Sequence, residues 1–289
     1  MLPRRLKDSI KVLLGMANAV AIEVSTEVPQ KLSDCVDCVE VTESPKYFCS
    51  VCASPVKKFS ALPDFYYENL DKNGFIFSSF QSETMNQFQY SCPVCGASDR
   101  DRLYALYFQK ELSEVHNGFR FLDIAPSSSL QSFIKTKYSH INYRSADLTM
   151  GGVDDVVDIT SMNIYEDNNF DFFICSHVLE HIQNDIKAMS ELYRVLKPGG
   201  KGIAMVPIAL SLEEDYENPE ITTAEGRWKH FGQDDHVRMY SKSGFVNKLT
   251  STGFLVHQLD VNFFGYEIFD KHGIHPRSVL YVVEKRSDY

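Results

Sequence analysis

Residues 170–200, FDFFICSHVLEHIQNDIKAMSELYRVLKPGG, constrain the fold more than any other part of the chain. A short apolar run is followed by a polar turn and then by an amphipathic helix, which Asn184 or Asp185 can cap and Pro198-Gly199 ends. Its apolar stripe consists of Ile186, Met189, Leu192 and Leu196, at steps of three and four. Residues 201–208 then form a strand. A strand, a crossover helix and another strand make one unit of a parallel sheet.

Strands and helices alternate from residue 119 onward. Apolar runs predict strands at 119–124, 141–147, 153–158, 170–175, 201–208, 254–261 and 278–285, and periodicity predicts helices at 101–114, around 130–134 and at 241–252. This alternation indicates an α/β fold, a doubly wound, seven-stranded, mostly parallel sheet with helices on both faces. Ligands bind such sheets beyond the carboxyl ends of the strands.

Length and charge narrow the choice of function. The chain has 289 residues, 44% of them hydrophobic, which suits one large and one small domain with a substantial core. No run of about 18 apolar residues occurs, so no transmembrane helix is expected. The net charge of −10 disfavours a broad nucleic-acid-binding face and favours a small or neutral substrate. We expect a helix and linker at 1–45, a cysteine-rich part at 46–100 and the α/β domain at 101–289.

Basic residues precede an apolar stretch at 12–22, a pattern that loosely imitates a signal peptide. Asp8 and the shortness of the apolar stretch weaken that interpretation. Leu6, Ile10, Leu13 and Leu14 have helical spacing and favour an amphipathic helix. Such a helix would pack on the body of the protein or touch a membrane surface. We therefore expect a cytoplasmic protein, with peripheral membrane contact through this helix as the alternative.

Six of the seven cysteines form C-x-x-C pairs. Cys92 and Cys95 precede Gly96, which permits the tight turn of a metal-binding knuckle, and pairing them with Cys49 and Cys52 completes a tetrahedral structural zinc site. A small hairpin at 74–80 fits in the gap between the pairs. Redox-active dithiols, disulfides and unligated core cysteines are the alternatives.

Two further cysteine assignments stay open. Cys35 and Cys38 either share a site with Cys49 and Cys52 or belong to a flexible arm, which we favour. Cys175 ends a buried strand, and we expect a packed small hydrophobic residue there rather than a nucleophile.

Acids occupy the ends of three strands. Asp147 ends the second strand, where a carboxylate can accept hydrogen bonds from both hydroxyls of a ribose. Asp158 ends the third strand and can accept from an adenine amino group. Asp123, near the end of the first strand, can orient the first loop or meet an ammonium. A lone strand-end aspartate is more often a cap or turn residue, but three in register favour a ligand site.

The first loop, DIAPSSS at 123–129, lacks the G-x-G-x-x-G pattern that lets a backbone approach a pyrophosphate. This disfavours NAD and FAD. Small alanine and serine side chains still allow close approach of a cofactor without phosphates.

The chain resembles the class I S-adenosylmethionine-dependent methyltransferases over residues 90–285. The resemblance is carried by FLDIAP at 121–126, SADL at 145–148, DIT at 158–160, FDFFICSHVLEHI at 170–182 and LYRVLKPGG at 192–200. The last two are similar to the type 11 branch. CPVCG at 92–96 and FGQDDHVRMYS at 231–241 are similar to a bacterial subgroup with a cysteine-rich, zinc-ribbon-like head.

The resemblance implies a Rossmann-like methyltransferase fold, S-adenosylmethionine as cofactor and a structural Zn²⁺ in the head. It also implies the cofactor contacts. Asp123, Ile124, Ala125, Pro126 and Ser127 line the methionine part, Asp147 and Leu148 hold the ribose and flank adenine, Asp158 and Ile159 contact adenine, and Cys175, Ser176 and His177 face the sulfonium and the substrate. The family's usual glycine-rich loop is absent here.

Methyl transfer to a hydroxyl calls for a base with a pKa near neutral, which suits histidine. The candidates are His177, nearest the expected methyl group, His181, and His236, whose neighbouring carboxylate would fix its tautomer. Each has a structural alternative: a cofactor-contacting loop residue, a packed helix-start residue and a structural hydrogen bonder, respectively. Asp234 and Asp235 are an alternative site for a divalent ion. The insertion at 210–233 would roof the acceptor pocket.

These observations predict a methyltransferase acting on a small molecule or glycan, with O-methylation of a sugar or lipid-linked saccharide in polysaccharide biosynthesis as the favoured reaction. One rival is an RNA methyltransferase that grips RNA through the zinc head, which the acidic balance opposes. Others are a methyltransferase-like binding or assembly protein without turnover, supported by the missing glycine loop, and a zinc-mediated interaction module.

Overall fold

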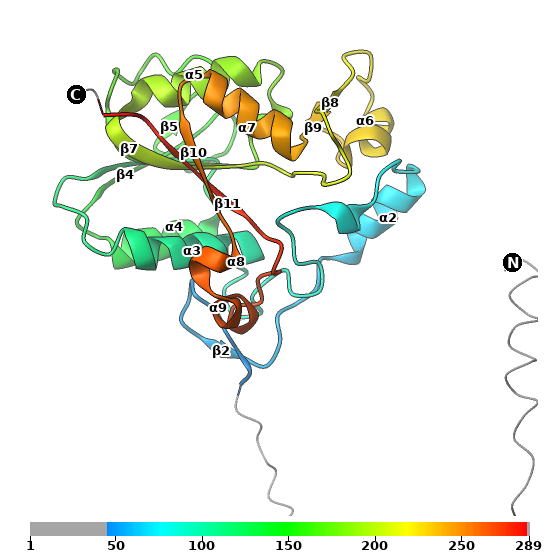
Figure 1. Cartoon of the computed structure of the whole chain (residues 1–289), viewed down its shortest axis with the longest axis horizontal. Helices are drawn as coiled ribbons and strands as arrows, with labels where there is room; N and C mark the ends of the chain where they lie inside the picture. The colour runs from blue at the N-terminus through cyan, green and yellow to red at the C-terminus, as the bar shows by residue number, and fades with distance from the viewer. Residues whose placement is uncertain (1–44, 288–289) are drawn as a thin grey trace, which may run out of the picture. The chain divides into compact units, whose positions relative to one another are not determined.

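A seven-stranded sheet lies at the centre of the computed structural model, which describes residues 45–287 (Figure 1). The strands lie in the order β10-β11-β7-β6-β3-β4-β5. Their bounds are β3 Arg120–Ile124, β4 Asn142–Asp147, β5 Asp155–Val156, β6 Phe170–Ser176, β7 Leu196–Met205, β10 Leu255–Leu259 and β11 Leu280–Glu284. Only β11 runs antiparallel to its neighbours in this sheet. The predicted mostly parallel sheet of seven strands is confirmed.

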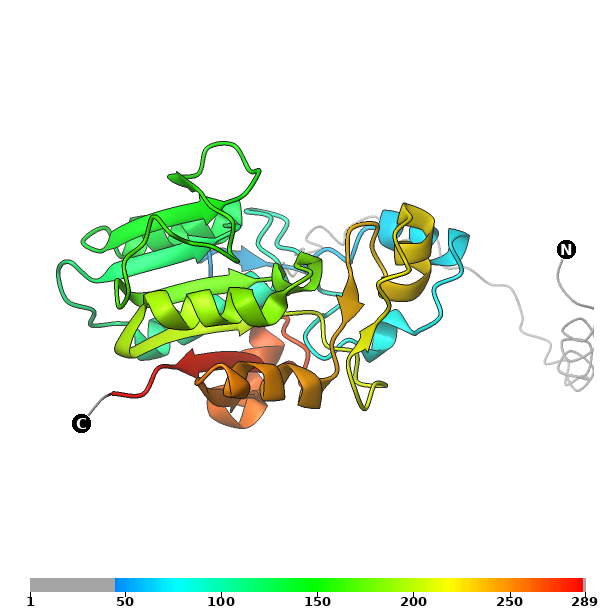
Figure 2. The same ribbon diagram turned by 90° about the horizontal axis from the view of Figure 1, so that it is seen from above.

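Helices cover both faces of the sheet (Figures 1 and 2). On one face lie α3 (Asp99–Glu111), α4 (Ser128–Lys137), α8 (Val261–Phe264) and α9 (Tyr266–Lys271), and on the other lie α5 (Asp185–Val195) and α7 (Lys242–Ser251). Alternation along β6 supplies the core of both layers. Phe172 stacks on Phe121 at 5.3 Å beneath α3, and Phe173 packs against Phe254 at 6.1 Å on the opposite face.

The helix α5 begins as predicted and ends earlier. The Asn184 side chain accepts a hydrogen bond from the Lys187 N–H at 3.0 Å, which confirms Asn184 as the cap. The strand β7 already starts at Leu196, so the Lys-Pro-Gly-Gly segment belongs to it rather than to a separate turn. The cause is pairing with the end of the chain: the Gly199 N–H donates to the Lys285 carbonyl at 2.7 Å.

The predicted hairpin at 74–80 is wrong. Between the two cysteine pairs the chain forms the helix α2 (Asp64–Lys72) and the 3-10 turn η1 (Ser79–Gln81). We call the two C-x-x-C turns, together with the short strand pair β1 (Tyr47–Phe48) and β2 (Pro55–Val56), the head. The segment between the pairs leaves the head and packs against the insertion after β7. The Ile76 N–H donates to the Lys229 carbonyl at 3.0 Å.

The insertion after β7 contains β8 (Tyr216–Glu217), α6 (Ala224–Phe231) and β9 (Arg238–Met239). Figures 1 and 2 both place α2 beside α6. We call residues 62–90 and 207–239 together the cap. Head, sheet and cap belong to one compact unit, Glu43–Tyr289. The predicted N-terminal helix and the Cys35/Cys38 pair lie outside the described residues. Within those residues no helix has the length and hydropathy needed to cross a membrane.

Candidate functional site

The predicted cofactor residues gather at one edge of the sheet. Register pairs Ile124 of β3 with Ala146 of β4 and with Cys175 of β6, so the loops after these strands start at the same level. The strands β4 and β6 flank β3 on opposite sides, which makes this point the topological switch where such sheets bind ligands. Asp147 pairs with Val156 of β5, and Asp158 follows at the same edge.

Asp147 and Asp158 each hold a tight turn with one carboxylate oxygen. Oδ1 of Asp147 accepts from the N–H groups of Thr149 at 2.7 Å and Met150 at 2.6 Å. Oδ1 of Asp158 accepts from the N–H and hydroxyl of Thr160, both at 2.8 Å, and these bonds lower the pKa of Asp158. The alternative given in the sequence analysis, that these aspartates stabilise turns, is therefore confirmed for both. It leaves the second oxygen of each aspartate for a ligand, and the ribose and adenine assignments stay predictions.

Asp123 lies deeper, with 2% of its surface exposed. The Tyr143 hydroxyl donates to its Oδ2 at 2.6 Å. Burial raises the pKa of Asp123 to about 7, with the nearby Asp101 adding to the effect and the Tyr143 hydrogen bond opposing it. Asp123 therefore carries only part of a negative charge near neutral pH.

The first loop reaches a glycine-like bend without glycine. Ala125 has a φ of +52°, in the left-handed region, and its N–H donates to the Ala146 carbonyl at 2.9 Å. An L-residue there costs roughly 1–2 kcal/mol relative to glycine. The Ser127 side chain caps α4 by accepting from the Leu130 N–H at 3.3 Å. The first loop therefore makes a left-handed turn at Ala125 without glycine, at a higher conformational free energy than glycine would have.

The other predicted cofactor residues differ in exposure. Ile124, Ile159 and Cys175 are side chains of the hydrophobic core, so only their backbones could touch a cofactor. Pro126 is half-buried, whereas Leu148 is 57% exposed beside Asp147. The expectation that Cys175 is a packed small residue agrees with its complete burial, which also raises the pKa of its thiol. The roles of these residues stay predictions.

A cavity of about 310 Å³ lies between the carboxyl edge and the cap. We call it the capped cavity. His177, Glu180 and His181 line it from the segment after β6, His236 and Phe231 line it from the cap, and Arg100 lines it from α3. The structure thus brings all three predicted base candidates to one cavity. The roof predicted at 210–233 is only half of the cap, because residues 62–90 form the rest.

His177 faces Glu180. It has a φ of +56°, and its Nδ1 lies 3.2 Å from Oε1 of Glu180, which is 1% exposed. Burial lowers the pKa of His177 to about 4, the positive charge of Arg100 acts in the same direction, and Glu180 opposes both. His177 is therefore neutral at pH 7 but a weak proton acceptor.

His236 is oriented by a different group from the one expected. Its Nδ1 lies 3.2 Å from the backbone carbonyl of Phe231, so the prediction that a neighbouring carboxylate fixes its tautomer is wrong. Asp235 instead places Oδ2 3.2 Å from Nδ1 of His181. The two imidazole rings meet edge to face, with centroids 4.7 Å apart. Burial lowers the pKa of His236.

The start of α3 supplies functional candidates that sequence reasoning missed. The Tyr104 hydroxyl lies 2.8 Å from the Ser176 hydroxyl, and the Ser127 hydroxyl donates to Asp101 at 3.0 Å. Arg100 lines the capped cavity, and its guanidinium makes no hydrogen bond within residues 45–287. The capping box between Ser98 and Asp101 was a readable signal for this helix start. Nothing in the sequence indicated which loops the helix would meet.

The four predicted metal ligands form one cluster. The Sγ atoms of Cys49 and Cys95 lie 3.8 Å apart, those of Cys52 and Cys92 lie 3.9 Å apart, and all four lie within 4.8 Å of one another. A tetrahedral zinc ion with Zn–S bonds of 2.3 Å requires sulfur separations of roughly 3.8 Å. The donor set and its dimensions therefore fit zinc.

Both knuckles turn in the same way. The residue after the second cysteine adopts a left-handed conformation in each, with a φ of +55° at Ala53 and +76° at Gly96. The Val94 N–H points to the Cys92 sulfur at 3.4 Å. Gly96 was predicted to allow this turn, and the other knuckle achieves it with alanine.

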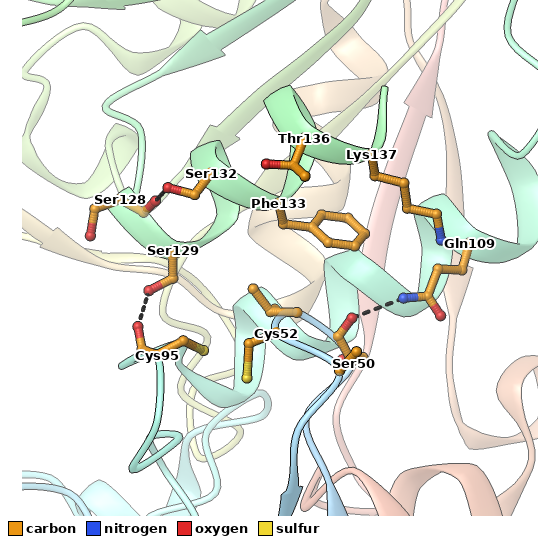
Figure 3. Close-up of a pocket in the computed structure, with 12 residues that line it drawn as sticks. Ser50, Cys52, Cys95, Gln109, Ser128, Ser129, Ser132, Phe133, Thr136 and Lys137 are labelled. Atoms are coloured by element: carbon orange, nitrogen blue, oxygen red, sulfur yellow. Dashed lines mark hydrogen bonds between the residues drawn. The ribbon is translucent and has the colours of Figure 1, made fainter. Parts of the chain in front are cut away.

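A larger hollow of about 600 Å³ lies between the head and α4 (Figure 3). It contains none of the predicted cofactor residues. The Ser129 hydroxyl donates to the Cys95 carbonyl at 2.5 Å, and the Gln109 amide donates to the Ser50 carbonyl at 2.9 Å (Figure 3). These bonds attach the head to α4 and α3 rather than to the cofactor edge.

Comparisons with known proteins agree with this topology. Residues 115–204 match the family described as the methyltransferase domain, Methyltransf_11. An 81-residue stretch is 38% identical to an uncharacterized protein of Methanocaldococcus jannaschii, covering 27% of this chain and 36% of that protein. A 58-residue stretch is 45% identical to the ubiquinone/menaquinone biosynthesis C-methyltransferase UbiE of Hydrogenovibrio crunogenus, covering 19% and 23%. The chain thus spans well under half the length of either relative.

Among solved structures, similarity extends to phosphoethanolamine N-methyltransferase 2 of Haemonchus contortus, with 17% identity, a TM-score of 0.43, and coverage of 77% of this chain and 56% of that one. A SAM-dependent methyltransferase of Archaeoglobus fulgidus gives 14% identity and a TM-score of 0.41, covering 63% and 92%. Residues 115–204 are thus similar to a methyltransferase-domain family, and the strand order of the sheet is compatible with that similarity.

Proposed function

We propose that this protein transfers the methyl group of S-adenosylmethionine to a hydroxyl of a small molecule or glycan, such as a sugar or lipid-linked saccharide. The capped cavity is the observation that carries the proposal. It opens beside His177, directly after β6, where the resemblance implies that the methyl group lies. The family match of residues 115–204 supports the cofactor.

Several residues would bind the cofactor and position its methyl group. Asp147 and Asp158 would hold the ribose and adenine through the oxygens that their turns leave over, and the bend at Ala125 would bring the first loop close to the methionine part. The cofactor supplies an electrophilic methyl group on a sulfonium. Tyr104 would fix the Ser176 hydroxyl beside it. Positioning of this kind provides most of the rate enhancement in methyl transfer.

His236 is the better base candidate. Its Nδ1 is directed at the Phe231 carbonyl, so the tautomer that donates this bond leaves Nε2 able to accept a proton. His177 stays neutral, but its pKa of about 4 makes it a poor acceptor. The acceptor hydroxyl would lose its proton to His236 as its oxygen bonds to the methyl carbon.

The cavity suits a compact polar acceptor. Its volume of about 310 Å³ is at the lower end of small-molecule sites. Aromatic residues Tyr66, Phe75 and Phe231 line it together with Ser79, Thr84 and Gln233. Aromatic faces with polar neighbours match a sugar ring. The guanidinium of Arg100 makes no hydrogen bond within the described residues, although Asp99 and Asp101 are close enough to interact with its charge, and it could therefore bind an acceptor that carries a carboxylate or phosphate.

We further propose that the four-cysteine cluster holds one structural zinc ion. Bonds from its four thiolates to the metal would join the two knuckles. The hydrogen bonds of Ser50 with Gln109 and of Cys95 with Ser129 would then hold this rigid head on α3 and α4. Membrane contact through the predicted N-terminal helix also remains a proposal, since that segment lies outside the described residues.

The test combines binding and turnover on the full chain. Calorimetry should show one S-adenosylmethionine bound per chain, and radiolabelled methyl groups should pass to nucleotide-linked or lipid-linked saccharides. Alkali-stable label on a hydroxyl would support O-methylation. Cofactor binding without transfer to any acceptor would favour the non-catalytic alternative. Transfer to RNA in preference to saccharides would overturn the acceptor assignment.

A further inference from the structure

Three side chains of the capped cavity form a cluster with metal-ligand chemistry. Potential ligand atoms of Glu180, His181 and His236 all lie within 4.8 Å of one another. Glu180 and His181 come from η2 (Leu179–His181), the turn after β6, and His236 comes from the cap just before β9. The backbone joins the two parts, because the Val237 N–H donates to the Glu180 carbonyl at 2.9 Å.

Glu180 has no hydrogen-bond partner for its charge. It is 1% exposed, and neither Oε1 nor Oε2 accepts a hydrogen bond within the described residues. Nδ1 of His177 lies 3.2 Å from Oε1 without hydrogen-bond geometry, and this contact is an ion pair only if His177 is protonated. Arg238 does not reach it, since its guanidinium bonds to Glu217 and to carbonyls of the turn after β6. A buried carboxylate in this position calls for a cation.

Both imidazoles are oriented as metal ligands usually are. Nδ1 of His181 faces the carboxylate of Asp235 at 3.2 Å, and Nδ1 of His236 faces the Phe231 carbonyl at 3.2 Å. Each Nδ1 thus has an acceptor for its proton, and each Nε2 keeps a lone pair. Carboxylate and carbonyl partners of this kind fix the tautomer of metal-binding histidines.

We propose that Glu180, His181 and His236 bind one divalent first-row transition-metal ion in the wall of the capped cavity. Two imidazoles and a carboxylate suit manganese, iron, cobalt or zinc, and three protein ligands leave positions open toward the cavity. This site differs from the cysteine cluster, whose soft thiolates select zinc.

The role of the ion rests on the proposed function and narrows the acceptor to one with two neighbouring oxygens, such as a vicinal diol of a sugar. Coordination would lower the pKa of one hydroxyl. With the ion bound, Nε2 of His236 is a ligand and no longer the base, so the O–H bond breaks and the proton leaves to a water molecule. The oxygen then bonds to the methyl carbon as the carbon–sulfur bond breaks, with the electron pair staying on sulfur.

The test uses Mn²⁺, which avoids thiolates, on full-length protein that metal analysis shows to hold one zinc ion per chain, an amount that the soft thiolates of the cysteine cluster take up first. Loss of the free-Mn²⁺ electron paramagnetic resonance signal should give one tight site per chain, with nitrogen modulation from bound imidazole. Glu180→Gln and His236→Gln should each weaken the site at least tenfold. Exposed residues provide matched controls: Glu225→Gln and His257→Gln should leave it unchanged.

Wild-type protein that binds no Mn²⁺ would overturn the proposal, as would undiminished binding by Glu180→Gln or a bound ion without nitrogen modulation. The wild-type titration and its modulation decide the matter even if a variant fails to fold. Calorimetry with S-adenosylmethionine on the same samples separates the two proposals. Cofactor binding without Mn²⁺ binding removes only the metal site, and Mn²⁺ binding without cofactor binding removes only the methyltransferase proposal.

Discussion

The cysteine cluster and the capped cavity were assembled in opposite ways. Each knuckle of the cluster places two ligands three residues apart, with a left-handed turn after the second, so half of the site is local. The cavity is lined by Arg100 of α3, Glu180 of the turn after β6 and His236 of the cap, and none of these elements is near another in sequence. The comparison shows why the gathering of the four cysteines could be predicted from their spacing, while the capped cavity was only partly foreseen.

The two regions should also fail differently. Loss of the cluster should act on folding, because its ligands hold β1, β2 and the knuckles together. Loss of cavity residues should act on binding and turnover while the sheet stays intact. The following experiments test this division, in order of decreasing effect.

Cys92→Ser should have the largest effect. It removes one of the four proposed zinc ligands, so the head should lose several kcal/mol of the stabilisation that metal binding would supply. Thermal unfolding with and without a chelator, together with zinc analysis, measures this. Cys175→Ala, at a buried cysteine outside the cluster, should keep one zinc and lose about 1 kcal/mol. Full zinc content in Cys92→Ser would refute the ligand assignment.

His236→Gln should lower kcat by about 10²–10⁴-fold, the range for loss of a general base, with little change in S-adenosylmethionine affinity. His257→Gln, at an exposed histidine paired with Glu284, should match the wild type. Steady-state kinetics and calorimetry check both. Equal loss of turnover and cofactor binding would mean that His236 only supports the fold.

Asp147→Asn should weaken cofactor binding by about 1–3 kcal/mol through loss of a charge-assisted bond to the ribose. Asparagine keeps the side-chain carbonyl that holds the turn at Thr149 and Met150. Asp260→Asn, in a comparable capping position at α8, is the matched control. Unchanged affinity in Asp147→Asn would exclude the ribose role.

Cofactor affinity should depend on the protonation of Asp123. Only its ionised form can compensate an ammonium, and its pKa is about 7. Affinity should therefore fall about eightfold from pH 7.5 to pH 6, a range in which the ammonium of the cofactor stays mostly protonated. Because folding raises this pKa, the contribution of Asp123 to folding stability declines as pH rises from about 4 to 7. Asp123→Asn should abolish both trends; a flat affinity profile in the wild type would count against the ammonium contact.

Much of the fold was predictable because local patterns and tertiary packing agreed. The apolar run at 170–175 predicted β6 correctly, and the predicted stripe located most of α5. Ile186 is 38% exposed, however, and Ala188 and Val195 complete the buried face with Met189 and Leu192. The strand β5 is only two residues long, shorter than the predicted 153–158, because register with β4 ends at Val156. The prediction of a hairpin within segment 57–91 was wrong because aromatic residues of this segment pack against α6, which is distant in sequence. Phe65, for example, packs on Trp228.

The residues of the candidate site also fall into two groups, those that local sequence patterns predicted and those that depend on tertiary packing. Residues that directly follow a strand, such as Asp147 and His177, could be placed at the carboxyl edge from the sequence. Glu180 received no predicted role, since its burial without a hydrogen-bond partner within the described residues cannot be read from its sequence neighbours. The orientation of His236 by a carbonyl and of His181 by Asp235 depends on the path of the cap and not on sequence neighbours.

The helix α4 ties the two regions together within one turn. Ser127 bonds to Asp101 next to the first loop, and Ser129, two residues on, bonds to the knuckle at Cys95. A change in the conformation of the Cys92/Cys95 knuckle should therefore alter the position of Ser127 and of the first loop, which is the proposed binding site of the methionine part. Loss of the proposed zinc ion should therefore disturb the proposed cofactor loop as well as the head, so α4 is the one place where the two regions are not independent.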